Sequence, residues 1–449
     1  MSGAVLIDGC AIATVDGAGT EHEQGWLLLD GSRIAALGGG APPPLPAGGR
    51  RVDARGLLAT PGLVNCHHHL YQWATRGYGQ SSTLFEWLVE LYPIWTRLDA
   101  EILAGAASAG LAQLALSGCS TTTDHHYVFP RGRGDLLAAE IAAARTLGLR
   151  FHPCRGSMDL GASQGGLPPD EVCEPRDQIL AATDEAITRF HDDAPGSMLQ
   201  VAVAPCSPFS VSGELMREAA ELARRRGVRL HTHLAETVDE EAFCLERFGC
   251  RPVEYCEQLG WLGPDVWLAH CIHLSPAEID RLAETGTGVA HCPSSNSRLG
   301  AGIAPVAALV GAGVSVGLGV DGAASNEHGE LVAELRQALY LARASGGPTA
   351  LSPRTALALA TTHGARCLGR AGELGSLEAG KLADIALWRV DPAIADPVCA
   401  LVLGATHRVE HLLVQGCFVV EHGRLTGADE DEITAGAVRA SRQIAGASG

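Results

Sequence analysis

The sequence predicts an α/β protein built on a closed (β/α)₈ TIM barrel, with a small flanking β-sandwich formed by both ends of the chain. Three observations favour this fold. Apolar strand-like runs alternate with amphipathic stretches through the middle of the chain, eight such runs are present, and short β-like runs with Gly-rich turns occupy both ends. Repeated strand–helix units give parallel strands, and eight of them can close into a barrel.

The β-like runs at the two ends share one sequence pattern, in which short apolar segments are separated by Gly, Asp and Pro. They are residues 4–13, 25–36 and 51–59 near the start and 382–390 and 407–425 near the end. Strands from both ends commonly pair where the termini meet. We therefore predict that residues 1–60 and 370–449 form the β-sandwich domain, with a C-terminal helix, and that residues 61–369 form the barrel.

Eight strands are predicted between these flanks, each followed by a turn or a helix. They are residues 64–69, 119–126, 149–154, 200–206, 228–236, 266–271, 287–293 and 314–322. The helices predicted between them include 135–147, 213–226, 275–285 and 329–344. An open doubly wound sheet is the alternative arrangement of the same units.

A long segment with its own helix, residues 70–98, follows the first predicted strand. Its aromatic side chains are Phe85, Trp87, Tyr92 and Trp95. Such residues can form the wall of a substrate pocket, or they can only pack the segment against the barrel. The sequence leaves both interpretations open.

Composition excludes several classes of partner and site. The formal net charge is −18, whereas nucleic-acid grooves and anionic membrane surfaces attract clustered Lys and Arg. The start of the chain lacks a signal-peptide pattern, and no apolar stretch is long enough for a membrane span. The fourteen cysteines are scattered without a CxxC pair, which favours buried thiols over disulfides or a zinc knot. We therefore predict a cytoplasmic protein with a small-molecule substrate.

Polar residues gather where predicted strands end. His67, His69, His233, His270 and Asp321 all lie at or just beyond the carboxyl end of a strand. Barrel enzymes build their active sites at that face. One such histidine is more often a satisfied core residue, but several on one rim indicate a functional site.

The spacing of these residues favours a metal centre. His67 and His69 are two positions apart, so on a strand both imidazoles face the same side. With His233 and Asp321 they form a nitrogen-rich set with one carboxylate, which suits zinc or, less well, iron, and leaves room for water. A bound ion would lower the pKa of that water towards neutrality. His68 points away from its neighbours, so we predict a structural role for it.

Glu236 follows His233 by three positions, where the predicted strand gives way to a loop. A carboxyl group there could carry a proton from water to a ring nitrogen or to a departing amine. It could equally be an ordinary acidic residue at the start of a helix.

The chain resembles the amidohydrolase superfamily, in the aminohydrolase branch that contains guanine deaminases, chlorotriazine hydrolases and 8-oxoguanine deaminases. Stretches that carry the resemblance run along nearly the whole chain in the family's order. They are TPGLVNCHHHLYQ (60–72), HTHLAE (231–236), LAHCIHLS (268–275), VAHCPSSNSRLGAGIAP (289–305), GLGVDGAASN (317–326) and GSLEAGKLADIAL (375–387).

The resemblance implies a role for each residue at the strand ends. His67, His69, His233 and Asp321 would hold one divalent metal ion, and Asp321 would double as a base. Glu236 would shuttle protons, and His270 would polarise the attacking water or stabilise its adduct. No Lys ends the fourth predicted strand, where binuclear relatives place a bridging ligand, so a mononuclear site is expected.

The resemblance also bears on substrate. The histidine run with the segment after it and the stretch APCSPFSVS (204–212) resemble the 8-oxoguanine deaminases more than the guanine deaminases, which implies conversion of 8-oxoguanine to urate and ammonia. Gln72 and Cys206 are the candidate substrate contacts. Alternatives are a triazine, pterin or guanine aminohydrolase, a chlorohydrolase, and, more remotely, a non-catalytic scaffold barrel. Relatives often form homo-oligomers, so one is possible here.

Overall fold

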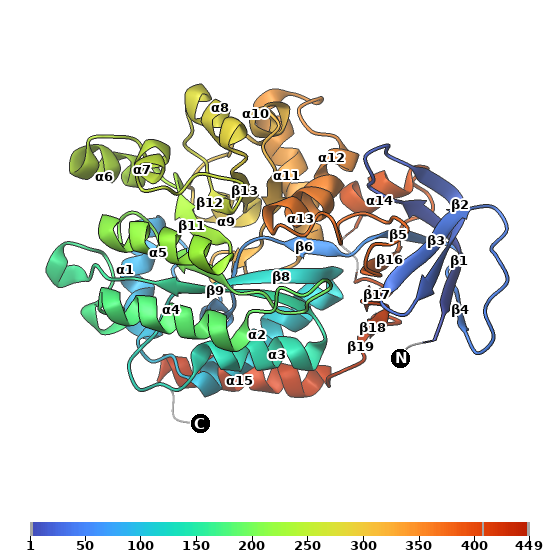
Figure 1. Ribbon diagram of the computed structural model, residues 1–449, viewed down its shortest axis with the longest axis horizontal. Coiled ribbons are helices and arrows are strands. Elements are labelled where there is room, and N and C mark those ends of the chain that lie inside the picture. Colours follow the sequence, from blue (N-terminus) through green and yellow to red (C-terminus); the bar gives the residue numbers. More distant parts are fainter. Residues whose placement is uncertain (1–2, 406–407, 447–449) are drawn as a thin grey trace.

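The computed structural model, which describes residues 3–405 and 408–446, contains a closed barrel of parallel strands (Figure 1). In chain order its strands are β6 (Leu63–Asn65), β8 (Cys119–His126), β9 (Arg150–Ser157), β10 (Ala202–Pro205), β11 (Leu230–Leu234), β12 (Val266–His270), β13 (Gly288–His291) and β14 (Val316–Leu318). β14 pairs back onto β6 through Leu318 and Asn65. This closure confirms the predicted (β/α)₈ barrel and overturns the open-sheet alternative.

A two-stranded ladder extends the barrel wall at its rim. β7 (His68–His69) pairs in parallel with β15 (Asp321–Gly322), just beyond the ends of β6 and β14. The first and last predicted strands are therefore each broken in two. The break on the second side coincides with a φ of 60° at Asp321, a left-handed conformation that interrupts an extended strand.

Helices cover the outside of the barrel (Figure 1). They are α1 (Leu84–Trp95), α2 (Ala100–Leu116), α3 (Leu136–Leu147), α4 (Arg176–Phe190), α5 (Gly213–Arg226), α6 (Val238–Phe248), α7 (Pro252–Gln258), α8 (Pro276–Thr285), α9 (Pro293–Arg298), α10 (Val306–Gly311), α11 (Leu331–Gly346), α12 (Pro353–Ala358), α13 (Gly364–Cys367), α14 (Pro397–Leu403) and α15 (Glu430–Ala445). Short helical turns η1 (Leu70–Thr75), η2 (Ala162–Gln164), η3 (Asp170–Val172) and η4 (Leu359–His363) lie between them. Within residues 3–405 and 408–446, no helix has both the length and the hydropathy that a membrane span requires.

Local sequence explains where these helices begin and end. At α8, the Ser275 side chain accepts a hydrogen bond from the backbone N–H of Glu278. The Glu278 carboxylate in turn accepts one from the backbone N–H of Ser275. This capping box satisfies two N–H groups that the first turn leaves free. Gly286 then ends the helix with a φ of 70°, which glycine adopts without steric cost.

Strands from both chain ends join into one mixed sheet beside the barrel. They are β1 (Val5–Ala13), β2 (Glu21–Asp30), β3 (Arg33–Gly39), β4 (Arg50–Asp53), β5 (Leu57–Pro61), β16 (Ile385–Arg389), β17 (His411–Val414), β18 (Cys417–Glu421) and β19 (Arg424–Leu425). Antiparallel pairing of β5 with β16 connects the two ends. The proposed domain limits, 1–60 with 370–449 and 61–369, stay predictions, and residues 1–2, 406–407 and 447–449 lie outside the described residues.

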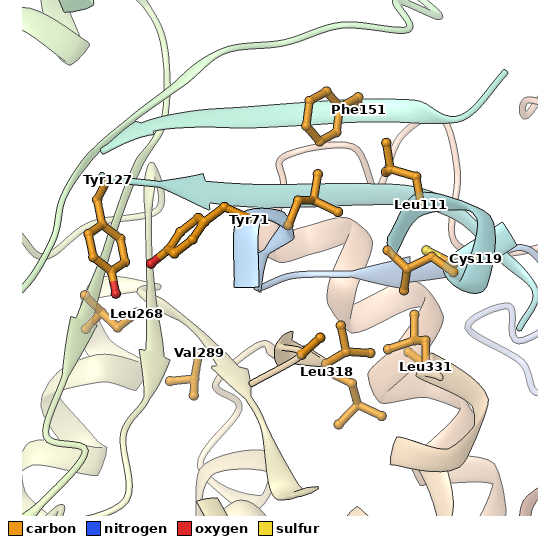
Figure 2. Close-up of a cluster of buried hydrophobic side chains, with 14 of the residues drawn as sticks. Tyr71, Leu111, Cys119, Tyr127, Phe151, Leu268, Val289, Leu318 and Leu331 are labelled. Carbon is orange, nitrogen blue, oxygen red and sulfur yellow. The ribbon is translucent and has the colours of Figure 1, made fainter. Parts of the chain in front are cut away.

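The core is apolar and lies between the strands and the helices that cover them. Figure 2 shows part of it, where side chains from the strands, the covering helices and the segments after β7 and β8 approach one another. The labelled residues are Tyr71, Leu111, Cys119, Tyr127, Phe151, Leu268, Val289, Leu318 and Leu331. All fourteen cysteines are free thiols and most are buried, in agreement with the sequence-based expectation.

A buried ion pair connects the barrel to the mixed sheet. Arg150, on β9, directs one guanidinium nitrogen to both carboxylate oxygens of Asp384 at 3.1 Å, and another donates to the carbonyls of Gly196 and Ser197. Neither charged side chain is more than 2% exposed. The arginine thus satisfies several buried acceptors at once.

We expect Arg150→Met to lower the free energy of unfolding by about 3–5 kcal/mol, because it leaves the Asp384 charge buried and unpaired. Urea denaturation measures this change. The control is Arg224→Met, which removes the half-exposed pair between Arg224 and Asp265 and should cost no more than about 1 kcal/mol. Equal effects of the two substitutions would contradict the role given to the buried pair.

Candidate metal centre and active site

The predicted site residues meet at the carboxyl ends of the barrel strands. His69 lies on β7, His233 near the end of β11, His270 at the end of β12, and Asp321 on β15. Asp321 and His270 have φ values of 60° and 72°, and Ala235, just before Glu236, has 52°. Non-glycine residues in this left-handed region are uncommon and tend to cluster at functional sites. The backbone therefore bends where side chains must turn inward.

Three short contacts link four ligand-type atoms. The Nε2 atoms of His67 and His69 each lie 3.3 Å from Oδ1 of Asp321, and Nε2 of His69 lies 3.1 Å from Nε2 of His233. Atoms bound about 2.1 Å from a tetrahedral ion are separated by about 3.4 Å. The spacing therefore fits four ligands around a single divalent ion.

Outer hydrogen bonds orient two of these imidazoles. Nδ1 of His69 donates to the carbonyl of His125 at 2.7 Å, and Nδ1 of His233 donates to the carbonyl of Cys206 at 2.7 Å. A ring that donates from Nδ1 keeps a lone pair on Nε2. This pattern is typical of histidines that bind a metal.

His67 also donates from Nδ1 and keeps a lone pair on Nε2, but its acceptor is another histidine. Nδ1 of His231 donates to the carbonyl of Trp267, so its Nε2 accepts the hydrogen bond from Nδ1 of His67 at 2.8 Å. Nε2 of His67 is then left with a free lone pair, and it has no hydrogen-bond partner although it is buried. An orphaned acceptor of this kind, aimed at Asp321, fits a metal ligand.

Electrostatics favour the protonation states that a metal needs. Burial lowers the pKa of His67, His69 and His233, so these imidazoles stay neutral at pH 7. Burial alone would raise the pKa of Asp321, but its close contact with the neighbouring imidazoles, His67 first, brings the pKa well below its ordinary value. The set is thus three neutral donors and one carboxylate, as ligands must be.

Glu236 and His270 stand beside this cluster. Oε2 of Glu236 lies 3.6 Å from Nε2 of His270, which lies 3.9 Å from Oδ2 of Asp321. Burial raises the pKa of Glu236 to about 7, and nearby His270 partly offsets that effect. Asn296 accepts the hydrogen bond from Nδ1 of His270, and the Glu240 carboxylate accepts the backbone N–H of Glu236. The His270 ring and the backbone at Glu236 are therefore held in position.

A pocket opens over these groups. Gln72 and Cys206 line it together with the ligand cluster, Glu236 and His270. Oε1 of Gln72 is buried without a partner. Of the aromatics in residues 70–98, Trp87 and Tyr92 line the pocket, whereas Trp95 is buried against Tyr71. The segment thus both walls the pocket and packs on the barrel.

A family model described as "Amidohydrolase family" matches residues 58–419. The chain belongs to the amidohydrolase family. An 8-oxoguanine deaminase from Pseudomonas aeruginosa is 46% identical over 92% of each chain. A hydroxydechloroatrazine ethylaminohydrolase from Pseudomonas sp. is 37% identical, covering 96% of this amidohydrolase and 94% of that protein.

The fold of this amidohydrolase also matches solved structures. The atrazine chlorohydrolase TrzN from Arthrobacter aurescens TC1, complexed with zinc, superposes with a TM-score of 0.93 and 34% identity, covering 97% of this chain and 100% of that one. The match confirms that the barrel and the strands beside it follow the family arrangement.

Several residues of the amidohydrolase site were not singled out from the sequence. His231 orients His67, Asn296 orients His270, and Ser295 donates to Oδ2 of Asp321 at 2.7 Å. His231 could have been found, because it lies two positions before His233 and so shares its face of β11. Nothing in the spacing of Ser295 or Asn296 indicates their roles.

His125 is a further neighbour of the ligands. One of its ring nitrogens lies within 4.8 Å of ligand atoms of His67, His69 and His233, while Nε2 bonds to the carbonyl of Ala204 at 2.8 Å. His68 instead accepts the backbone N–H of His69 through Nδ1. That local contact agrees with the structural role predicted for His68.

Proposed function

We propose that this amidohydrolase catalyses the hydrolytic deamination of a purine-like heterocycle, 8-oxoguanine, to urate and ammonia. The observation that carries the proposal is the convergence of three neutral imidazole Nε2 atoms and one carboxylate beside Glu236. Deamination of this ring is also the activity named for a relative 46% identical to the chain.

In this proposal, His67, His69, His233 and Asp321 hold one divalent ion, zinc by the preference of nitrogen-rich sets. When bound, such an ion lowers the pKa of a water molecule towards neutrality. Asp321 would accept a proton from the attacking water through Oδ2, the oxygen that faces His270. His270 would stabilise the oxygen that adds to the ring carbon.

Glu236 moves protons between water and substrate. Its pKa of about 7 lets it accept and release a proton near neutral pH. It takes one proton from the water and delivers it to the ring nitrogen as the amino-bearing carbon becomes tetrahedral. The second proton of the water, accepted by Asp321, passes to the leaving nitrogen, which then departs as ammonia while the C=O bond forms. Chloride needs no proton to leave, so an intact Glu236 favours an aminohydrolase over a chlorohydrolase.

Gln72 and Cys206 are proposed to contact the ring edge. The unpartnered Oε1 of Gln72 can accept from a ring N–H or an amino group. Cys206 also lines the pocket. Its carbonyl accepts from the His233 ring, and its thiol, whose pKa burial raises to about 12, would act as a weak donor to the ring edge.

We expect purified protein to release ammonia from 8-oxoguanine with a kcat/KM at least about tenfold above that for guanine, isoxanthopterin or a hydroxylated aminotriazine, since each 1.4 kcal/mol of discrimination gives a factor of ten. Coupled ammonia detection and the absorbance of urate measure the two products together. A higher kcat/KM on a pterin or triazine would transfer the proposal to that ring. Stoichiometric metal with no turnover on the whole panel would support a scaffold instead.

The proposal also includes a cytoplasmic location and a homo-oligomeric state. The acidic balance of the chain, with a net charge of −18, supports a small-molecule substrate over nucleic acid. Size measurement in solution decides the oligomeric state.

A further inference from the structure

A second cluster of metal-type ligands lies outside the barrel interior. Asp124 and His126 are two positions apart on β8, on the face opposite His125, and Glu140 projects from α3, which packs against β9. One ligand atom from each of the three lies within 4.8 Å of the others, and none of the three side chains is exposed. The cluster therefore lies between the barrel wall and its helical cover (Figure 1).

The atoms that face one another in this cluster lack partners. They are Oδ2 of Asp124, Nδ1 of His126 and both carboxylate oxygens of Glu140. Nδ1 of His126 lies 3.5 Å from Oε2 of Glu140, close to the separation of about 3.4 Å between two ligands on one tetrahedral ion. The candidate catalytic ligands show similar separations: the contacts of His69 with His233 and of His67 and His69 with Asp321 measure 3.1–3.3 Å.

The outer contacts of His126 fix the direction of its lone pair. Nε2 donates to the carbonyl of Val128 at 2.9 Å, so Nδ1 is the unprotonated nitrogen. That lone pair faces a carboxylate oxygen, and two lone pairs repel unless a cation or a proton lies between them. The arrangement matches a metal-binding histidine whose other nitrogen bonds to a backbone carbonyl.

No basic side chain compensates the two carboxylates. Among residues 3–405 and 408–446, neither Asp124 nor Glu140 forms an ion pair with Lys or Arg. Arg155, whose charge acts on His126, is paired with Glu174. Two buried carboxylates with a neutral imidazole carry a charge of −2, which one divalent cation would balance.

We propose that Asp124, His126 and Glu140 form a second, structural site for a divalent transition-metal ion, separate from the catalytic centre. Oxygen and imidazole ligands suit zinc or manganese. Oδ1 of Asp124 accepts the backbone N–H of Leu70 at 2.5 Å, directly after His69. The ion would thereby fix the segment that carries a ligand of the catalytic centre.

A shared proton is the competing explanation. Burial raises the pKa of Asp124 to about 7 and that of Glu140 well above its ordinary value, so a neutral Glu140 could donate to His126. Glu140→Gln separates the two explanations, because the amide N–H₂ group imitates the protonated acid but binds metal poorly.

The experiment counts metal in the full-length protein. Protein is expressed and reconstituted with Zn²⁺ alone, desalted, and measured by mass spectrometry for zinc per chain. We expect two equivalents in the wild type, one in Glu140→Gln, and a lower melting temperature for the variant. The matched control is Glu278→Gln, a buried glutamate bonded to Arg251, which should keep two equivalents.

Other outcomes overturn the proposal. One equivalent in the wild type, with an unchanged melting temperature in Glu140→Gln, would show that a proton fills the cluster. Two equivalents that persist in Glu140→Gln but fall to one in His422→Ala would place the second ion at the partly exposed Glu410–His411–His422 group. If Glu140→Gln fails to fold, the zinc count of the wild type still decides between a metal ion and a proton. The zinc count of His422→Ala then decides which of the two groups, Asp124–His126–Glu140 or Glu410–His411–His422, holds the second ion.

Discussion

Removal of metal with dipicolinate is expected to lower kcat/KM for ammonia release on the order of 10³-fold or more, and Zn²⁺ should restore it. The reason lies in the chemistry of the four ligands. His67, His69 and His233 are buried and neutral, and Asp321 supplies one negative charge, so these four ligands themselves supply no cation that could ionise water at pH 7. Activity is measured against zinc content during stepwise reloading.

The reloading curve identifies which ion matters. We expect activity to rise in proportion to the first equivalent that binds at the catalytic ligands and to be lost in His69→Ala at any zinc concentration that leaves the fold intact. His422→Ala, which alters the partly exposed Glu410–His411–His422 group, is the control and should reload to full activity. Full turnover in protein that retains less than one tenth of an equivalent of zinc would contradict the metal-centred proposal.

The barrel could be predicted because its signals are local and repeated. Each predicted strand is a short apolar run followed by a turn or a helix, and all eight predicted runs overlap a barrel strand. His67 and His69 were recognisable because two positions on a strand share a face. The resemblance then connected them with His233 and Asp321, which lie far away in sequence. In the structure, His69 lies 3.1 Å from His233, and both His67 and His69 lie 3.3 Å from Asp321.

What the sequence did not reveal depends on contacts made across the barrel. The carbonyl of Cys206 orients His233, and His231 orients His67 across 164 positions in sequence. Such partners are set by the closure of the barrel rather than by periodicity. The first predicted strand is divided into β6 and β7 and the last into β14 and β15, and the left-handed backbone at Asp321 beside the second break is not predicted by any residue pattern.

The buried Asp124–His126–Glu140 cluster was missed for a related reason. Asp124 and His126 lie in the run TTTDHH, where each looks like one more polar residue at the end of a strand. Only the packing of α3 brings Glu140 to them. Alternation along β8 divides that run between two sites, His125 towards the catalytic ligands and its neighbours towards the helices.

Glu236→Gln is expected to lower kcat/KM for 8-oxoguanine by about 10²–10⁴-fold while zinc content stays at the wild-type level. Glutamine fills the same space beside His270 but can neither take a proton from water nor give one to the ring nitrogen and the amine. Because Glu236 is not among the four converging ligand atoms, its loss should not release the ion. Steady-state ammonia release and metal analysis of the same sample measure the two effects.

A matched substitution and a second substrate sharpen this test. Glu246→Gln, on the exposed side of α6, changes the same functional group without contact with the pocket and should leave kcat/KM within about twofold, as surface substitutions usually do. A ring bearing chloride in place of the amine needs no protonated leaving group, so any turnover of it should fall less in Glu236→Gln. If the amine and chloride substrates lose rate equally, Glu236 acts on the attacking water and the ring nitrogen and not on the leaving amine; if neither loses rate, it is not the proton shuttle.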